Sequence, residues 1–264
     1  MQPSASATQA SSIRIQARVL GALLMREMVM RYGRQNIGFL WLIIEPMILT
    51  CGVMIMWSLL RHEAHGLVLI AFVLSGYMPL TLWRHVTSHA VLCFRQNSPL
   101  LYHRQVRPLD TVIARSLMEI AGTTGALIVV YATLRLADII PPYANLGLLV
   151  TGWLTMAWLA FGTGLVLAAA TEQFEFVEKM VAPAQYLILP ISGMFFMVAW
   201  LPTRVQELSL YFPLVNCFEI FRAGMFGNRV ETFYDMGYLI RCCLFVTAVG
   251  LLMVRRAGRH IEFD

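Results

Sequence analysis

Long apolar runs alternate with short polar segments along most of this chain. A helix needs about 20 apolar residues to cross a bilayer. Six runs reach that length: Ile37–Leu60, Leu67–Cys93, Thr111–Leu134, Leu146–Ala170, Met180–Leu201 and Met236–Val254. The pattern therefore predicts an all-α integral membrane protein with six transmembrane helices.

The segment Met25–Pro46, MREMVMRYGRQNIGFLWLIIEP, changes within a few residues from an amphipathic pattern to an apolar run. At about 100° per residue, apolar and basic side chains just before it separate onto two faces: Ala17, Leu20, Leu23 and Leu24 lie opposite Arg14, Arg18 and Arg26. We predict an amphipathic surface helix over residues 13–36. A disordered tail over residues 1–12, without the apolar core of a signal peptide, precedes it. The alternative is a simple membrane anchor with basic flanks.

Two connecting segments are expected to carry structure. In Phe94–Pro108, FRQNSPLLYHRQVRP, the prolines Pro99 and Pro108 bracket a short run compatible with a helix. Such a segment can dock on a soluble partner, or it is a plain basic loop. Pro202–Asp235 is too apolar for a solvated loop, and its charges and Pro213 prevent it from spanning.

Within Pro202–Asp235 we predict two short helices, Leu208–Phe212 and Val215–Met225, that enter the outer leaflet and return. Irregular backbone at that depth is tolerated only when it is buried in protein or lines a cavity. A re-entrant hairpin of this kind could close one end of a pathway. A passive pair of interfacial helices is the alternative.

Composition agrees with a membrane protein. Hydrophobic residues make up 58% of the 264, charged residues 13%, and mean hydropathy is +0.67, whereas soluble domains carry about 25% charged residues. Twelve Lys and Arg lie on the side of the termini and five on the other, which predicts that both termini are cytoplasmic. The net charge of +5 reflects this bias, so nucleic acid is not an expected partner. We expect one membrane domain over 37–254 and a cytoplasmic tail over 255–264.

No catalytic or metal site is predicted. The chain has no phosphate-binding loop, no HExxH and no nucleophile elbow, so it is not expected to be an enzyme. His85 and His89 lie i, i+4 without a third ligand nearby, which favours a core or pore-facing pair over zinc. The five cysteines show no metal-ligand spacing and are expected to pack as small apolar residues.

Ionisable and aromatic residues inside the spans are the candidates for lining a pathway, because a charge in the bilayer must face protein or water. The candidates are Glu45, Trp83, Arg84, His85, Phe195, Trp200 and Arg241. Structural ion pairs and interfacial aromatic belts explain them equally well. Arg115 and Glu119 lie near the start of a span, where long side chains can reach the interface. Glu219 and Arg222, spaced i, i+3, are expected to pair.

Three segments in this order resemble the ABC-2 type permeases, in particular those that export capsular polysaccharides. They are Met25–Pro46, NSPLLYHRQVRPLD with the following ARSLMEI (Asn97–Asp110, Ala114–Ile120), and SGMFFMVAWLP with LVNCFEIFRAGMFG (Ser192–Pro202, Leu214–Gly227). The resemblance covers nearly the whole chain after the tail. It implies a permease subunit, two copies of which form a pore in the bacterial inner membrane.

The resemblance also implies partners and roles. A separate cytoplasmic ATPase dimer would hold ATP and Mg²⁺, with no cofactor in this chain. The residues that would contact it lie on the interface and coupling helices: Arg26, Arg31, Arg34, Arg95, Tyr102, His103, Arg104 and Arg107. The hairpin Leu208–Met225 would form a periplasmic gate containing Phe212, Pro213, Glu219 and Arg222. A copolymerase-type adaptor, an outer-membrane channel, membrane lipid and a lipid-linked acidic polysaccharide complete the expected partners.

Rival functions are less well supported by the sequence. A secondary transporter is expected to show related halves with broken spans and midplane acids, and only Glu45 is a candidate acid. A membrane glycosyl- or acyltransferase needs a His/Asp or Asp/Asp constellation, and none is apparent. An ABC-2 permease that exports O-antigen, teichoic acid or another glycolipid stays open as the main alternative.

Overall fold

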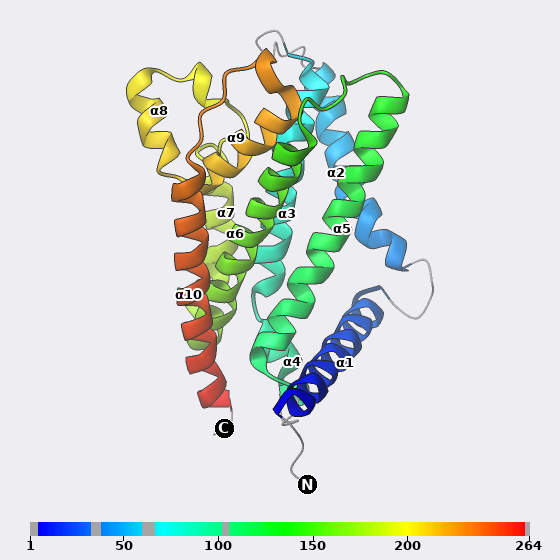
Figure 1. Ribbon diagram of the computed structural model, residues 1–264, viewed down its shortest axis with the longest axis vertical. Coiled ribbons are helices and arrows are strands. Elements are labelled where there is room, and N and C mark those ends of the chain that lie inside the picture. Colours follow the sequence, from blue (N-terminus) through cyan, green and yellow to red (C-terminus); the bar gives the residue numbers. More distant parts are fainter. Residues whose placement is uncertain (1–4, 33–37, 60–66, 102–105, 262–264) are drawn as a thin grey trace.

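The computed structural model describes residues 5–32, 38–59, 67–101 and 106–261, and every regular element within these ranges is a helix (Figure 1). The α-helices are α1 (Ala5–Tyr32), α2 (Gly38–Leu59), α3 (Leu69–Ala90), α4 (Cys93–Leu101), α5 (Pro108–Leu136), α6 (Leu146–Gln173), α7 (Glu175–Ile188), α8 (Thr203–Leu210), α9 (Pro213–Phe226) and α10 (Met236–Ile261). Two 3₁₀ turns, η1 (Val198–Trp200) and η2 (Gly227–Arg229), follow α7 and α9.

Helix α6 forms the centre of the bundle. It packs against α3, α9 and α10, and 61% of its most apolar window is buried, compared with 22% for α2 and for α10. Both chain ends lie at one end of the bundle, here called the termini end, where α1 lies obliquely beside α4 (Figure 1). Helices α8 and α9 lie at the opposite end.

Glycine permits the close approach of α6 and α9. A Cβ atom on Gly224 would lie 2.2 Å from the backbone nitrogen of Leu149, and one on Gly152 would lie 2.5 Å from that of Phe221. Any larger residue would force the two helices apart. The seam places Phe218 and Ile220, both fully buried, in the main hydrophobic core.

Four helices of the described ranges are long and apolar enough to cross a membrane: Leu40–Leu59, Pro108–Leu136, Leu146–Gln173 and Met236–Gly258. They correspond to the first, third, fourth and sixth predicted spans. Helix α3 covers most of the second and has 22 residues. Its polar residues, among them Arg84, His85 and His89, make it less apolar than the other four.

The fifth predicted span is not one continuous helix, which corrects the helix predicted there; a crossing of the membrane at this segment stays a prediction. Helix α7 has 14 residues and is therefore about 21 Å long, shorter than the bilayer core of about 30 Å. It ends before Pro190, and Gly193 has a φ of +94°, a conformation that breaks a helix. Irregular backbone follows as far as η1.

Other boundaries also differ from those predicted. Helix α1 begins at Ala5, inside the stretch predicted to be a disordered tail. Helix α4 begins at Cys93 and contains Pro99, whereas the sequence placed the helix after that proline. The two short helices predicted within Pro202–Asp235 are present as α8 and α9, but their bounds differ from those predicted. Their insertion into a leaflet stays a prediction.

Candidate functional site

A cluster of polar side chains, of which Glu27, Arg115 and Glu119 are buried, joins four helices at the termini end. We call it the Arg115 cluster; its members are Glu27 of α1, His85 and His89 of α3, Gln96 of α4, and Arg115 and Glu119 of α5. The Arg115 guanidinium donates from Nε to the Glu27 carboxylate, from Nη1 to the His89 carbonyl (3.1 Å) and from Nη2 to Gln96 Oε1 (2.7 Å). One side chain thus links α5 to α1, α3 and α4.

The second half of the cluster lies one helical turn further along α5. Glu119 is 2% exposed, and its carboxylate lies 3.1 Å from His89 Nδ1 and 3.5 Å from His85 Nδ1. His89 Nδ1 also lies 2.9 Å from the His85 carbonyl. Since both of these neighbours of His89 Nδ1 are acceptors, that nitrogen carries the hydrogen. The i, i+4 pairs of α3 and α5 therefore face each other.

The cluster corrects the expectation that Arg115 and Glu119 extend toward the interface. Arg115 is 7% exposed, and both side chains are paired within the bundle. Sequence reasoning also missed Glu27, which follows the predicted contact residue Arg26 and is 6% exposed. The matching i, i+4 spacings of His85/His89 and Arg115/Glu119 indicate that each pair shares one face of its helix, but not that the two faces meet.

Helix α1 has two further polar contacts beside the cluster. Arg26 donates to the Asn97 side-chain oxygen on α4, and Gln16 donates to the Asp110 carboxylate at the start of α5. Asp110 also accepts the backbone N–H of Arg107 (3.0 Å), which caps α5. Helices α1, α4 and α5 therefore form one hydrogen-bonded unit at the termini end.

The predicted ATPase-contact residues fall into three groups. Arg26 is turned toward α4, as described above. Arg95 and Arg107 are exposed, and Arg95 lies 3.9 Å from Glu172 and 4.0 Å from Glu178, distances typical of weak surface pairs. The remainder lie outside the described residues, in whole or in their side chains: Arg31, Arg34, Tyr102, His103 and Arg104.

A second buried cluster lies at the opposite end and is centred on Arg222 of α9. Arg222 is fully buried, and its guanidinium donates to the carbonyls of Gly193 and Met194 (both 2.8 Å) and of Phe196. It also lies over the Phe72 ring, 4.7 Å from the centroid. Arg222 thus satisfies the backbone of the irregular segment that follows α7.

Glu219 completes this second cluster. Its carboxylate lies 3.9 Å from Arg222, which confirms the predicted i, i+3 pair. It accepts the backbone N–H groups of Val198 (3.2 Å) and Phe233 (3.1 Å), so it ties α9 to the segments on both sides. The other two predicted gate residues lie at the start of α9, where Phe212 is 49% exposed and Pro213 is the first helical residue. Their role as a gate stays a prediction.

The predicted pathway residues make separate side-chain contacts in the described part of the chain. Arg84 lies over the Tyr186 ring of α7 (5.0 Å), Phe195 stacks on Trp57 of α2 (6.0 Å), and Trp200 packs on Phe72 (5.0 Å).

The rest of the predicted pathway residues are spread over several helices. Glu45 and Arg241 are exposed on α2 and α10, and His85 belongs to the Arg115 cluster. Trp83 is buried, and its indole N–H has no hydrogen-bond partner among the described residues.

In the described ranges no group of three or more His, Cys, Asp or Glu side chains is placed to hold a metal ion. Both clusters instead connect helices through charged hydrogen bonds. This arrangement is suited to transmitting a movement between helices.

The chain is similar over nearly its whole length to several known proteins, although no family model matches it. It is 43% identical to the capsule polysaccharide export inner-membrane protein CtrC of Neisseria meningitidis serogroup B, over 95% of both chains. It is 40% identical to the capsule polysaccharide export inner-membrane protein BexB of Haemophilus influenzae, over 99% of both chains. The polysialic acid transport protein KpsM of Escherichia coli is 25% identical over 93% of this chain and 95% of its own.

Proposed function

Because the chain belongs to the family of capsule polysaccharide export inner-membrane proteins, the ABC-2 type permeases, we propose that it is the permease subunit of an exporter. It moves a lipid-linked capsular polysaccharide across the bacterial inner membrane. The similarity to CtrC and BexB over nearly the full length is the observation that carries this proposal. The chain itself is a transport protein and not an enzyme, so a separate ATPase supplies the energy.

The proposed topology has six crossings with both termini in the cytoplasm. Helices α2, α3, α5, α6 and α10 each cross once, and α7 with the irregular segment after it makes the fifth crossing. Helices α8 and α9 form the re-entrant hairpin on the periplasmic side. The position of both termini at one end of the bundle (Figure 1) supports an even number of crossings.

The proposed energy coupling enters at the termini end. An ATPase dimer contacts the exposed side of α1 and the segment after α4, and ATP binding moves them together. The Arg115 cluster passes that movement to α3 and α5, because its hydrogen bonds join all four helices. A second copy of the chain, a periplasmic adaptor and an outer-membrane channel complete the assembly.

The cargo pathway is proposed to follow the surface that α2, α3 and α7 share. The Arg84–Tyr186 contact joins α3 to α7, and the Trp57–Phe195 contact joins α2 to the irregular segment after α7. Tyr186 is 60% exposed. A half-buried cation among aromatic rings suits an acidic sugar polymer. Arg241, exposed on α10, lies outside this surface, and its pathway role is not carried forward.

Deleting the gene and locating the glycan tests the proposal. We expect lipid-linked polysaccharide to accumulate inside the cell and the surface capsule to disappear, with both restored by the wild-type gene. Chemical analysis of the accumulated glycan separates capsule from O-antigen or teichoic acid, the alternative cargoes of this architecture. An unchanged cell surface with no intracellular glycan would contradict an export function.

A further inference from the structure

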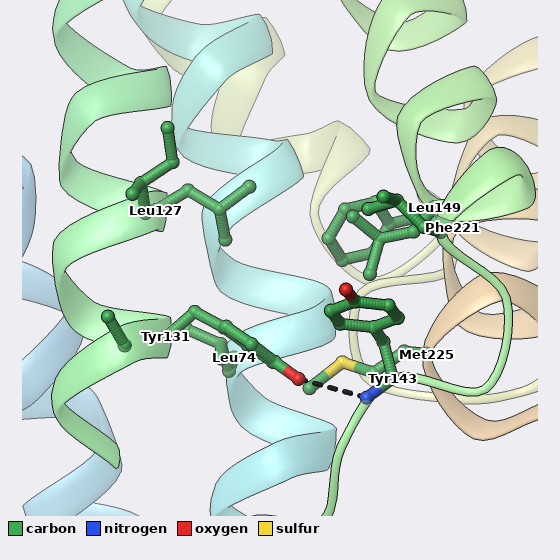
Figure 2. A pocket seen from close by; sticks show the side chains of 10 residues that line it. Leu74, Leu127, Tyr131, Tyr143, Leu149, Phe221 and Met225 are labelled. Carbon is green, nitrogen blue, oxygen red and sulfur yellow. Dashed lines mark hydrogen bonds between the residues drawn. The ribbon is translucent and has the colours of Figure 1, made fainter. Parts of the chain in front are cut away.

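A pocket of about 220 Å³ lies between α3, α5, α6 and α9 toward the end opposite the termini (Figure 2). Its walls consist of aliphatic and aromatic side chains: Leu127 and Tyr131 of α5 and Leu74 of α3 face Leu149 of α6 and Phe221 and Met225 of α9. The glycine seam between α6 and α9 fixes the wall that Leu149 and Phe221 form. An apolar cavity of this size stays dry and accepts hydrocarbon.

The pocket opens toward the surface that faces lipid. Two residues of its lining, Ile128 and Leu146, are 61% and 52% exposed. Ala132, which also lines the pocket, is exposed at its mouth. A hydrocarbon chain of the bilayer can therefore enter from the side without any helix moving.

Two tyrosines lie at the end of the pocket that is farther from the termini end. The Tyr131 hydroxyl accepts the backbone N–H of Tyr143 (2.9 Å), as the dashed line in Figure 2 shows, and the ring centroids are 6.0 Å apart. Tyrosines of membrane proteins concentrate at the boundary between hydrocarbon and headgroups. The pocket therefore lies just inside that boundary.

A cationic side chain, that of Arg135, lies just outside this boundary. Arg135 comes three and four residues after Ala132 and Tyr131, so it lies on the same face of α5. It pairs with Asp138 at 2.6 Å, but both side chains are exposed, by 42% and 86%, and such surface pairs are weak. Arg135 can therefore exchange this partner for a phosphate group.

We propose that this pocket binds one acyl chain of a phospholipid from the outer leaflet, with the lipid phosphate beside Arg135. Charge complementarity selects this occupant, because a phospholipid carries in one molecule an acyl chain for the apolar pocket and a phosphate for the exposed Arg135 guanidinium. The proposal requires that the chain lies in a membrane and does not depend on the identity of the cargo. It therefore stands or fails separately from the export function.

The test counts the phospholipids that stay bound to the purified protein in mild detergent, by native mass spectrometry. The protein is expressed in a strain without capsule synthesis, so that no cargo lipid is present. We expect one retained phospholipid per chain. Ala132→Trp, which fills the mouth of the pocket, should reduce this occupancy at least five-fold, and Arg135→Gln should reduce it several-fold.

The matched control is Ala121→Trp, at an exposed position about three turns earlier on α5, which should leave occupancy unchanged. Ala132→Leu fills less space and serves if the tryptophan variant does not fold. Equal occupancy in the Ala132 and Ala121 variants would show ordinary surface lipid and overturn the proposal. Loss of the bound lipid only in the capsule-free strain would also overturn the proposal. The same holds if the Ala132 variants change the oligomeric state of the protein without changing the amount of bound lipid.

Discussion

Two buried arginines each bind several groups that a lysine could not reach together. Arg115 bonds a carboxylate, a carbonyl and an amide oxygen on three different helices, and Arg222 bonds three carbonyls of one irregular segment. The planar guanidinium offers five donors in fixed directions, whereas an ammonium is a single point charge. Replacing either arginine therefore leaves buried groups unsatisfied.

Removing Arg115 is expected to destabilise the protein strongly. Arg115→Met removes one partner of a buried ion pair with Glu27, which costs about 3–5 kcal/mol of unfolding free energy. The double variant Arg115→Met/Glu27→Met should lose less than Arg115→Met alone, because both partners of the pair are removed together. Denaturant unfolding of the purified protein, followed by circular dichroism, measures both. Arg241→Met, at an exposed position, is the control; equal losses in the single and double variants would refute the pairing.

Replacing Arg222 should loosen the segment after α7. We expect Arg222→Lys to cost about 1–3 kcal/mol, since at least one buried carbonyl loses its donor, and Arg222→Met to cost more. Hydrogen exchange at residues 193–198 should increase in both variants, because these residues lose the donors that order them. Arg204→Met on the exposed surface of α8 should change neither the unfolding free energy nor the hydrogen exchange at residues 193–198. Unchanged exchange in Arg222→Met would contradict the assigned role.

At the scale of helices, periodicity and composition predicted most of the elements but not their ends. Four apolar spans were predicted because a long run such as Leu146–Ala170 can be recognised from its own composition, without knowledge of the neighbouring helices. The fifth failed because apolar composition continues through Pro190 and Gly193, where the backbone cannot remain helical. The Arg115 cluster could not be predicted because it depends on which faces of α1, α3 and α5 meet. That pairing is set by tertiary packing, not by spacing along one helix.

The seam between α6 and α9 gives a prediction at this scale. Gly224→Ala should destabilise the protein by about 1–3 kcal/mol, the usual cost of overpacking, because the added carbon would lie 2.2 Å from Leu149 N. Gly52→Ala on α2 is the matched control, since nothing lies within 4 Å of its added carbon. It should be neutral or stabilise by up to about 1 kcal/mol. Thermal unfolding of the two variants measures the difference, and equal behaviour would contradict the close packing.

At the scale of the whole molecule, the two clusters lie at opposite ends of the bundle and make different kinds of contact. The termini end joins α1 and α4 to α3 and α5 through charged and polar contacts, and the opposite end orders an irregular segment. The ATPase is therefore expected to bind only at the termini end. A reversal of charge there should affect assembly more than stability.

Arg107→Glu tests this expectation. Its side chain is exposed, so unfolding should be unchanged, while co-purification of the ATPase should fall at least ten-fold. The combination with Arg104→Glu should abolish it. Arg204→Glu, at the opposite end, should leave the complex intact. A complex that survives both changes at residues 104 and 107 would place the ATPase contact elsewhere.

The contacts of α1 have a consequence for the order of synthesis. Its partners Asn97, Asp110 and Arg115 lie 71, 94 and 88 residues later in the chain than Arg26, Gln16 and Glu27. When α1 leaves the ribosome, none of these residues has been made, so Glu27 cannot yet pair with Arg115. Helix α1 can therefore make these contacts only after α5 has been inserted. Its exposed apolar side chains, among them Met25 and Met30, allow α1 to lie on the bilayer surface during that interval.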